Sequence, residues 1–352
     1  MKIDLNGKNV WQQACGDKKQ NYSEVCIKWG VILNGPGSHG KWPECYPDIT
    51  EERSAKKGTE LRRFCELMKA GDIILLRLGT DTIIGVGEII GDYFWSDNFG
   101  DIDGWDLEHA RRVKWIWHDL GSPKIFSVYS LKFGDTTQTL TQVGEVWEWL
   151  NSLEVPEDIF NSPLPSLPLE WNFKTTIQEV SERLYHNGVS GNSINVLLRE
   201  FDELVRICKW YGDSTSWPSE RETVAYLVVP LLRALGWSPQ KMAVEWNNID
   251  LALFNTLPRK EDNLAVVVEC KKITLTCLTA FDQAERYALQ HPNCRRLIVT
   301  DGNRYGVYLK ENDDFILKAY MNLQRLRSEY PVYNARGIQD ALFMMTPEFS
   351  LV

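Results

Sequence analysis

Long apolar runs are missing from this sequence. No stretch approaches the ~18–20 uncharged apolar residues that a membrane-spanning helix needs. The first residues, Met1 to Asp4, include an acid and no apolar core, so we expect no secretory signal peptide. Positive charge is also in deficit, because 39 Lys and Arg stand against 48 Asp and Glu. The overall field therefore does not steer the chain to nucleic acid, and any such binding would need local basic patches.

Several motif classes are missing as well. The eight cysteines contain no CxxC spacing, which argues against a zinc finger or a thioredoxin-type motif and favours reduced thiols in a cytoplasmic protein. His39, His109 and His118 show no metal-ligand spacing with cysteine, and we interpret them as surface or core residues. The sequence contains no GxxxxGK[ST] motif, so we expect no ATP-driven translocation from this chain.

What is present predicts two globular domains. The chain has 352 residues, of which 43% are hydrophobic and 25% charged, enough to bury two cores of ordinary size. Four prolines lie between Pro156 and Pro168, where few apolar residues recur at regular spacing. Because proline stiffens the chain, we interpret residues 156–172 as a semi-rigid linker between domains at 1–155 and 173–352.

The first domain is predicted to be a small β-barrel with helices. Apolar runs and turn residues indicate a helix at Thr59–Lys69 and strands at Val25–Leu33, Ile73–Leu78, Thr82–Ile90, Val113–Trp117 and Ile125–Leu131. The turn at 79–81 joins two of these strands as a hairpin.

The second domain is predicted to be an α/β sheet with a helical lead-in, because strands and helices alternate along it. We expect helices at Thr176–His186, Ser193–Lys209, Ser219–Leu235 and Leu278–Gln290, and strands at Ile249–Phe254, Ala265–Cys270, Leu297–Thr300 and Gly306–Leu309.

Two of these strands, IDLALF (249–254) and VVVECKK (266–272), carry acids within apolar runs. Buried acids are costly unless they are paired or bind a metal. The period of two places Glu269 and Lys271 on one face of a strand, and Asp250 lies on a neighbouring strand. Two carboxylates could hold Mg²⁺, and a lysine beside them could stabilise the charge that develops during phosphodiester hydrolysis. A structural salt bridge is the alternative interpretation.

The surrounding order makes the pattern more specific. A helix with Glu222 in its first turn precedes the Asp250 strand, and a later helix places Gln283 and Tyr287 at i and i+4. This order resembles the PD-(D/E)XK nuclease fold, and most closely the nuclease domain of type I restriction enzyme R subunits, from about Trp217 to Tyr308.

The nuclease resemblance assigns roles to individual residues. It implies that Asp250 and Glu269 are metal ligands, that Lys271 is the catalytic lysine, and that Gln283 and Tyr287 form the QxxxY pair. Glu222 would be the helix acid, with Glu220 as a competitor for that role. The tail, at 320–326 and 337–345, also resembles this family, whereas Ile249 stands where the family has proline.

The first half has a looser resemblance. Nine of the 14 tryptophans lie within the first 150 residues, and residues 70–97 contain a strand, a tight turn and a Gly-rich second strand. Residues 25–131 resemble the EVE-like domains of the PUA superfamily, in which an aromatic pocket holds a modified base. We expect Trp42 and Trp95 to stack on such a base and Asp97 to pair with its edge, because loops carry binding residues more often than strands do. Core packing and a solvated acidic loop are the alternatives.

Together the two resemblances imply a modification-dependent (type IV-like) restriction endonuclease of a prokaryotic cell, active in phage defence. It would flip a modified base out of double-stranded DNA and hydrolyse the DNA with Mg²⁺. A nuclease directed to RNA and a non-catalytic binding protein are the alternatives. A homodimer is compatible with a double-strand break, which needs two sites. The sequence does not indicate which modified base is bound.

Overall fold

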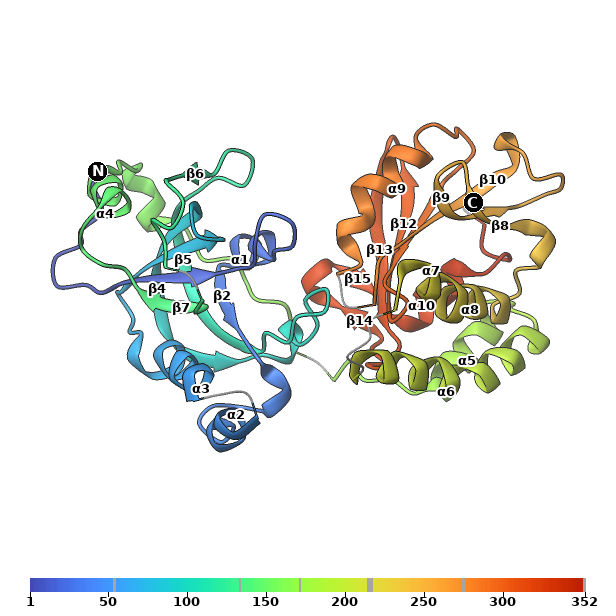
Figure 1. Ribbon diagram of the computed structural model, residues 1–352, viewed down its shortest axis with the longest axis horizontal. Helices are drawn as coiled ribbons and strands as arrows, with labels where there is room; N and C mark the ends of the chain where they lie inside the picture. Colours follow the sequence, from blue (N-terminus) through green and yellow to red (C-terminus); the bar gives the residue numbers. More distant parts are fainter. Residues whose placement is uncertain (53–54, 133, 171, 214–217, 274–275, 351–352) are drawn as a thin grey trace. The chain divides into compact units, whose positions relative to one another are not determined.

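The computed structural model describes residues 1–52, 55–132, 134–170, 172–213, 218–273 and 276–350. Contacts divide the chain into two bodies, Met1–Glu170 and Trp171–Val352, and each body has its own sheet with helices (Figure 1). This is the expected two-domain α/β architecture. Trp217, where the nuclease resemblance begins, and residue 171 of the expected linker lie outside the described residues. None of the described helices is long and apolar enough to cross a membrane.

The N-terminal body is built on a seven-stranded sheet that curls into a half-barrel (Figure 1). The order is β2-β5-β4-β3-β1-β7, with β6 paired to β4, and only β1 and β3 run parallel. Bulges in the long strand β4 increase its local twist and so help the sheet to curl. The strands are β1 (Val10–Ala14), β2 (Val31–Asn34), β3 (Ile73–Leu78), β4 (Thr82–Trp95), β5 (His109–His118), β6 (Lys124–Ile125) and β7 (Thr137–Thr139).

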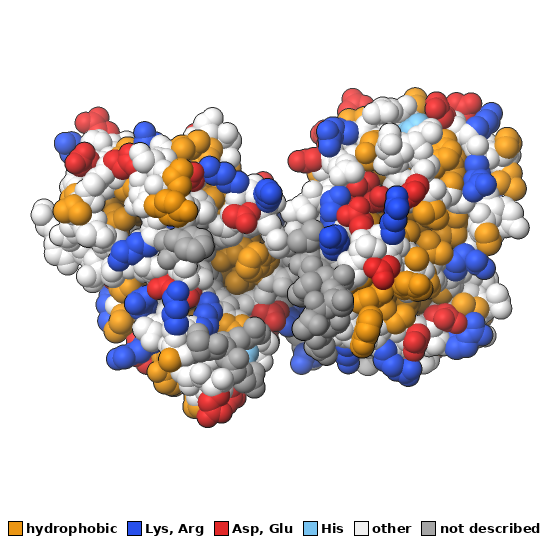
Figure 2. Space-filling model, viewed as in Figure 1, with side chains coloured by type: hydrophobic (Ala, Val, Ile, Leu, Met, Phe, Trp, Pro, Cys, Tyr) orange, Lys and Arg blue, Asp and Glu red, His pale blue; other side chains and the backbone are white. Residues whose placement is uncertain are grey.

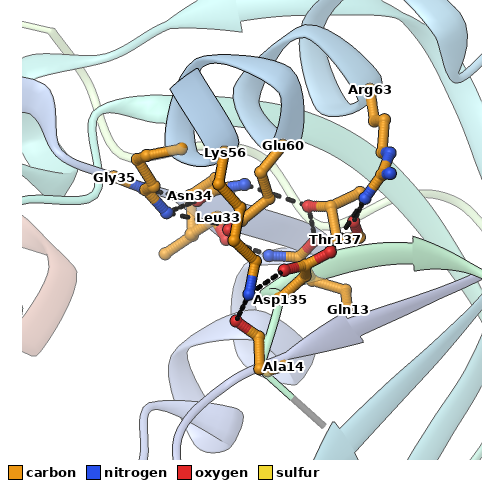
Figure 3. Close-up of polar contacts among 12 residues, drawn as sticks. Gln13, Ala14, Leu33, Asn34, Gly35, Lys56, Glu60, Arg63, Asp135 and Thr137 are labelled. Carbon is orange, nitrogen blue, oxygen red and sulfur yellow. Dashed lines mark hydrogen bonds and ion pairs between the residues drawn. The ribbon is translucent and has the colours of Figure 1, made fainter. Parts of the chain in front are cut away.

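Side chains join the two edges of this sheet. Asn34 at the end of β2 donates from Nδ2 to Thr137 Oγ1 on β7 at 2.9 Å, and Gln13 on β1 donates to the carbonyl of Leu33 at 2.7 Å. Thr137 in turn donates to Gln13 Oε1 at 2.6 Å. Gln13, Asn34 and Thr137 are fully buried, and Figure 3 shows them meeting beneath a helix. Buried polar groups that satisfy one another in this way make a rigid seam.

The helices of this body are α1 (Ser23–Trp29), α2 (Tyr46–Glu52), α3 (Ala55–Arg62) with a π-helical turn at Arg63–Leu67, and α4 (Glu145–Ser152). The expected helix at 59–69 and the expected hairpin of β3 and β4 are confirmed. The expected strand Val25–Leu33 is wrong in its first part, where α1 forms and ends at Gly30 with a φ of 58°. The expected strand Ile125–Leu131 is also wrong beyond its first residue, and the sequence reasoning missed β1.

The proline-rich segment lies against the N-terminal body. Arg112 donates to the carbonyls of Trp29 and Pro165, and Lys114 donates to the carbonyl of Phe160. Asn98 donates to the carbonyl of Pro168 at 3.2 Å. Side chains of the N-terminal body therefore hold the backbone of this segment at several points.

The C-terminal body has a mixed eight-stranded sheet in the order β14-β15-β13-β12-β11-β10-β9-β8. Strands β8, β9 and β10 form an antiparallel meander, and β10 and β11 run parallel with α9 between them in sequence. The strands are β8 (Met242–Trp246), β9 (Ile249–Phe254), β10 (Leu264–Cys270), β11 (Arg296–Thr300), β12 (Arg304–Glu311), β13 (Asp314–Asn322), β14 (Glu329–Tyr330) and β15 (Ala335–Arg336).

Helices pack on both faces of this sheet (Figure 1). One face carries α5 (Ile177–His186), α6 (Gly191–Asp213), α10 (Ile338–Met345) and a long helix made of α7 (Glu220–Thr223), a π-helical turn (Val224–Val228) and α8 (Val229–Ala234). The other face carries α9 (Phe281–Ala288). Every helix and strand that the sequence predicted in this half is present. The strands β8, β13, β14 and β15 and the helix α10 were not among those predicted.

Candidate functional site

Two carboxylates meet at neighbouring strands of the C-terminal sheet. Asp250 lies on β9 and Glu269 on β10, and the two strands pair with Leu251 opposite Val268. Asp250 Oδ2 accepts a hydrogen bond of 2.7 Å from the backbone N–H of Cys270. This bond fixes the first carboxylate beside the strand that carries the second.

A lysine just after the end of β10 completes the cluster. Lys271 Nζ donates to Glu269 Oε1 at 3.2 Å and to Gln283 Oε1, on α9, at 3.1 Å. The alternation along β10 places Glu269 and Lys271 on the face that α9 covers, because Val267 belongs to the apolar cluster on that face. Four of the residues predicted from sequence, Asp250, Glu269, Lys271 and Gln283, are therefore brought together.

Burial makes this cluster electrostatically strained. Glu269 is 1% exposed, and burial, followed by the charge of Asp250, raises its pKa to about 7 against the opposing effect of Lys271. Burial also raises the pKa of Asp250. Among the described residues, none forms a hydrogen bond with Glu269 Oε2. Two close carboxylates in a poorly solvated site favour the uptake of either a proton or a cation.

A divalent metal ion fits this donor set. The unpartnered Oε2 of Glu269 and the carboxylate of Asp250 are hard oxygen ligands of the type that Mg²⁺ prefers. Over the part of the chain that is described, no group of three or more His, Cys, Asp and Glu side chains is placed to hold a metal. The protein would thus contribute one or two carboxylates and water the rest, which is how Mg²⁺ is usually bound.

The two acids at the start of the preceding helix, α7, lie in different surroundings. Glu222 is exposed and belongs to the N-terminal capping box of α7, where it accepts a hydrogen bond of 2.7 Å from the N–H of Ser219. Glu220 is half-buried, and its pKa is raised by burial and by the charge of Asp250, while Lys271 and Lys272 oppose the shift. Of the two, Glu220 is the acid whose charge reaches the cluster.

Tyr287, one turn after Gln283, packs in the apolar contact between α9 and the sheet. Figure 2 shows acidic and basic side chains side by side in the middle of one face of the C-terminal body. The carboxylates of Asp250 and Glu269 beside the ammonium group of Lys271 can hold a cation next to an anion. That is the arrangement that phosphodiester chemistry needs.

In the N-terminal body, the three predicted base-binding residues belong to one chain of contacts. The N–H of Trp42 donates to Tyr93 Oη at 3.3 Å, and Tyr93 Oη lies 3.0 Å from His109 Nδ1. The ring of Trp95 meets the His109 ring edge-on, and its Nε1 donates to Asp97 Oδ1 at 2.7 Å. Trp42 and Trp95 are both half-buried, and the carboxylate of Asp97 already accepts a hydrogen bond from Trp95.

Two cavities lie elsewhere in this body and share a wall. A pocket of about 480 Å³ and a second of about 330 Å³ are both lined by Trp105 and Thr136. Neither includes Trp42, Trp95 or Asp97. Sequence reasoning missed Trp105, although it stands in a loop, between Gly104 and Asp106, and so met the criterion by which the other two tryptophans were chosen.

Three basic side chains of β5 make contacts within the fold. Arg111 is 2% exposed and donates to the carbonyls of Phe64 and Cys65, so it is not available to a phosphate. Arg112 and Lys114 donate to backbone carbonyls of the body that contains them. All eight cysteines are buried free thiols.

The fold and the cluster define a two-domain α/β protein with an Asp–Glu–Lys site in its second sheet. A family model described as "Domain of unknown function (DUF8426)" matches residues 5–143, within the N-terminal body. No curated protein matches the chain.

Proposed function

We propose that this protein is a modification-dependent, Mg²⁺-dependent DNA endonuclease of the PD-(D/E)XK type, with an EVE-like reader of modified bases in its N-terminal body. The single observation that carries the nuclease part is the cluster of Asp250, Glu269 and Lys271, in which a buried carboxylate oxygen faces no hydrogen-bond donor among the described residues. A salt bridge needs only one carboxylate beside Lys271, whereas the second one raises the pKa of Glu269 and so costs free energy.

The order of elements supports the same assignment. The elements follow one another as in the family that the sequence resembles: the helix with Glu220, the strand with Asp250, the strand with Glu269 and Lys271 just after it, and the helix with Gln283. The parallel strand β11 then pairs with β10 on the side away from β9.

The residues suggest how the reaction proceeds. Mg²⁺ held by Asp250 and Glu269 would polarise the scissile phosphate and lower the pKa of a bound water. Lys271, held by Gln283 at 3.1 Å, would orient that water or stabilise the negative charge that develops on the phosphoryl oxygens. Gln283 would act as a positioning residue, because it accepts a hydrogen bond from the ammonium group of Lys271.

The test compares otherwise identical plasmids that carry cytosine, 5-methylcytosine, 5-hydroxymethylcytosine, glucosylated 5-hydroxymethylcytosine or N6-methyladenine. We expect cleavage of at least one modified plasmid with Mg²⁺, none in EDTA, and none by the Lys271→Ala variant. Equal cleavage of all plasmids would remove the reader. Cleavage of matched RNA alone would favour the RNA-directed alternative, and selective binding without cleavage would favour a non-catalytic reader.

A further inference from the structure

The proline-rich segment (residues 156–170) has little regular structure and is held by side chains of the N-terminal body. Residues 163–170 belong to no helix or strand, and most of them are exposed. Proline has a carbonyl but no N–H, so a segment with four prolines presents backbone acceptors that other groups must satisfy. Three side chains of the same body supply donors to it.

Two of these donors stand on β5. Lys114 donates to the carbonyl of Phe160, and Arg112 donates to the carbonyl of Pro165. The ring of Pro165 also lies against Gly30, where a Cβ atom would stand 3.1 Å from Pro165 Cδ. Because β5 lies inside the sheet, between β2 and β4, these two contacts hold the segment to a rigid element.

The third donor comes from a loop. Asn98 belongs to the 3-10 turn Asp97–Phe99, is 6% exposed, and donates from Nδ2 to the carbonyls of Pro168 at 3.2 Å and Leu169 at 3.4 Å. The side chain of Leu169 is 75% exposed, so apolar packing does little to hold this residue. The C-terminal body begins two positions later, at 171. Asn98 therefore holds the chain just before the second body begins.

The same turn carries a residue that is predicted to contact the base. Asp97 Oδ1 accepts a hydrogen bond of 2.7 Å from Trp95 Nε1, and the ring of Trp95 meets that of His109 edge-on at 5.1 Å. A base that stacks on Trp95 or pairs with Asp97 competes with this hydrogen bond. Because Asp97 and Asn98 are consecutive residues of one short turn, a rearrangement of Asp97 displaces the amide of Asn98 as well.

The Asn98 contact is also the weakest of the three. Its distances of 3.2 and 3.4 Å lie at the long end of the range for hydrogen bonds, and both bonds share one nitrogen. Arg112 and Lys114 donate through charged groups, whose hydrogen bonds are roughly twice as strong. A ligand that disturbs the turn at 97–99 would therefore free residues 168–169 while the earlier part of the segment stays in place.

We propose that Asn98 is a positioning residue that couples the base reader to the nuclease. DNA held at Trp95 and Asp97 loosens the contact of Asn98 with Pro168 and Leu169, and the loosened segment lets the C-terminal body act on the DNA. This inference rests on the proposed function and adds regulation to it, since cleavage would require recognition and not binding alone. Because such coupling is reciprocal, a loosened segment should in turn favour the DNA-bound state.

The first experiment measures single-turnover cleavage, with the full chain in excess over plasmids that carry cytosine, 5-methylcytosine, 5-hydroxymethylcytosine or N6-methyladenine. We expect the wild type to cut one modified plasmid at least about tenfold faster than the cytosine plasmid, a factor that one hydrogen-bonding group can supply. Asn98→Ala and Asn98→Leu both remove the donor without adding charge. Both should raise the rate on the cytosine plasmid towards that on the modified one, and in EDTA both should bind modified DNA at least as tightly as the wild type.

The second experiment keeps Asn98 and follows the segment itself. All eight native cysteines are buried, so a nitroxide spin label attaches selectively to an added exposed cysteine. We place it by Leu169→Cys or, as a control, by Asn161→Cys, an exposed position next to Phe160. In EDTA, a duplex with one of the three modified bases should increase the mobility of the label at 169 and leave that at 161 unchanged, whereas the cytosine duplex should change neither.

Asn151→Ala is the matched control for the Asn98 variants. Its amide also donates to a backbone carbonyl, that of Trp147 at 2.8 Å, but within α4, so this variant should behave as the wild type. A tenfold preference that survives in both Asn98 variants would overturn the inference and leave the nuclease and the reader standing, as would weaker binding of modified DNA by these variants or an unchanged label at 169. Absence of cleavage together with a label that loosens on modified DNA would overturn the nuclease and support the response of the segment.

Discussion

Replacing Glu269 by Gln tests the cluster through stability and needs no cleavage assay. The carboxyl of Glu269 has a pKa of about 7 in the folded protein, because burial and the neighbouring Asp250 disfavour its charge, against an ordinary value of 4.5. A tenfold change in proton affinity is worth about 1.4 kcal/mol, so ionised Glu269 costs the fold on the order of 3 kcal/mol when no cation is bound.

The sign of the pH dependence follows from the raised pKa. Between pH 4.5 and about 7 the folded protein holds a proton that the unfolded chain has lost, so the free energy of unfolding falls as the pH rises through this window. The contribution is fully present below pH 4.5 and is lost above pH 7. The Gln side chain is neutral throughout, and the variant should therefore be more stable than the wild type at pH 8 and similar to it at pH 5.

Bound Mg²⁺ should reverse this order. A cation that binds only the folded wild-type protein stabilises it by mass action, and Glu269→Gln removes one of its ligands. We expect Mg²⁺ to raise the wild-type melting temperature at pH 8 and to leave that of Glu269→Gln nearly unchanged.

The assay is urea unfolding at pH 5 and pH 8, each in EDTA and in Mg²⁺, with Glu261→Gln as a control at an exposed position of the same body. A Gln variant that is less stable than the wild type at pH 8 in EDTA would refute the electrostatic argument. An equal response of both proteins to Mg²⁺ would refute Glu269 as a ligand.

Three further predictions concern single side chains. Lys271→Ala should abolish cleavage while binding of modified DNA and the melting temperature change little, and normal cutting by this variant would remove the proposed site. Glu220→Gln should lower the cleavage rate, because the charge of this acid reaches the cluster. Glu222→Gln should leave the cleavage rate intact and reduce the melting temperature slightly, because it weakens the capping contact of α7. The opposite pattern would make Glu222 the catalytic acid. If the rings of Trp42 and Trp95 stack on the base, replacing either by Ala should cost about 1–3 kcal/mol of binding free energy on modified DNA. If the ring of Trp105 stacks on the base instead, neither change should alter the affinity. Anisotropy and melting curves on the same samples distinguish a lost contact from a lost fold.

The elements that sequence predicted best are those whose pattern is local. In β10, five consecutive apolar residues are followed by Glu269. The period of two along an extended chain is enough to place Glu269 and Lys271 on one face. The helix that follows presents Gln283 by the same kind of short-range rule, and the structure brings it to Lys271. The choice between Glu220 and Glu222 was harder, because both acids lie in the first turn of α7. Which of the two faces β9 depends on how the start of that helix is oriented against the sheet.

The two missed elements, α1 and β1, have different physical causes. Residues 25–33 are rich in β-branched and apolar side chains, yet the first part forms α1, because Gly30 adopts a left-handed conformation and ends the helix just before β2. The strand β1 was missed because its glutamines look polar in sequence. Gln13 is nonetheless fully buried, since its amide closes the seam between the edges of the sheet.

The cavities follow from that seam. Asn34 and Thr137 hold the ends of β2 and β7 together, and the residue after Asn34 and the residue before Thr137 both line the larger pocket. The larger pocket therefore lies next to this contact, and its walls come from loops at 22, 35–38, 104–107 and 136 and from Lys57 of α3. No window of the sequence contains that information, because the seam joins residues about a hundred positions apart. A site that depends on the closure of a curled sheet becomes visible only once the sheet has been built. A site on two neighbouring strands and the helix that follows them can be predicted from the local spacing of its residues.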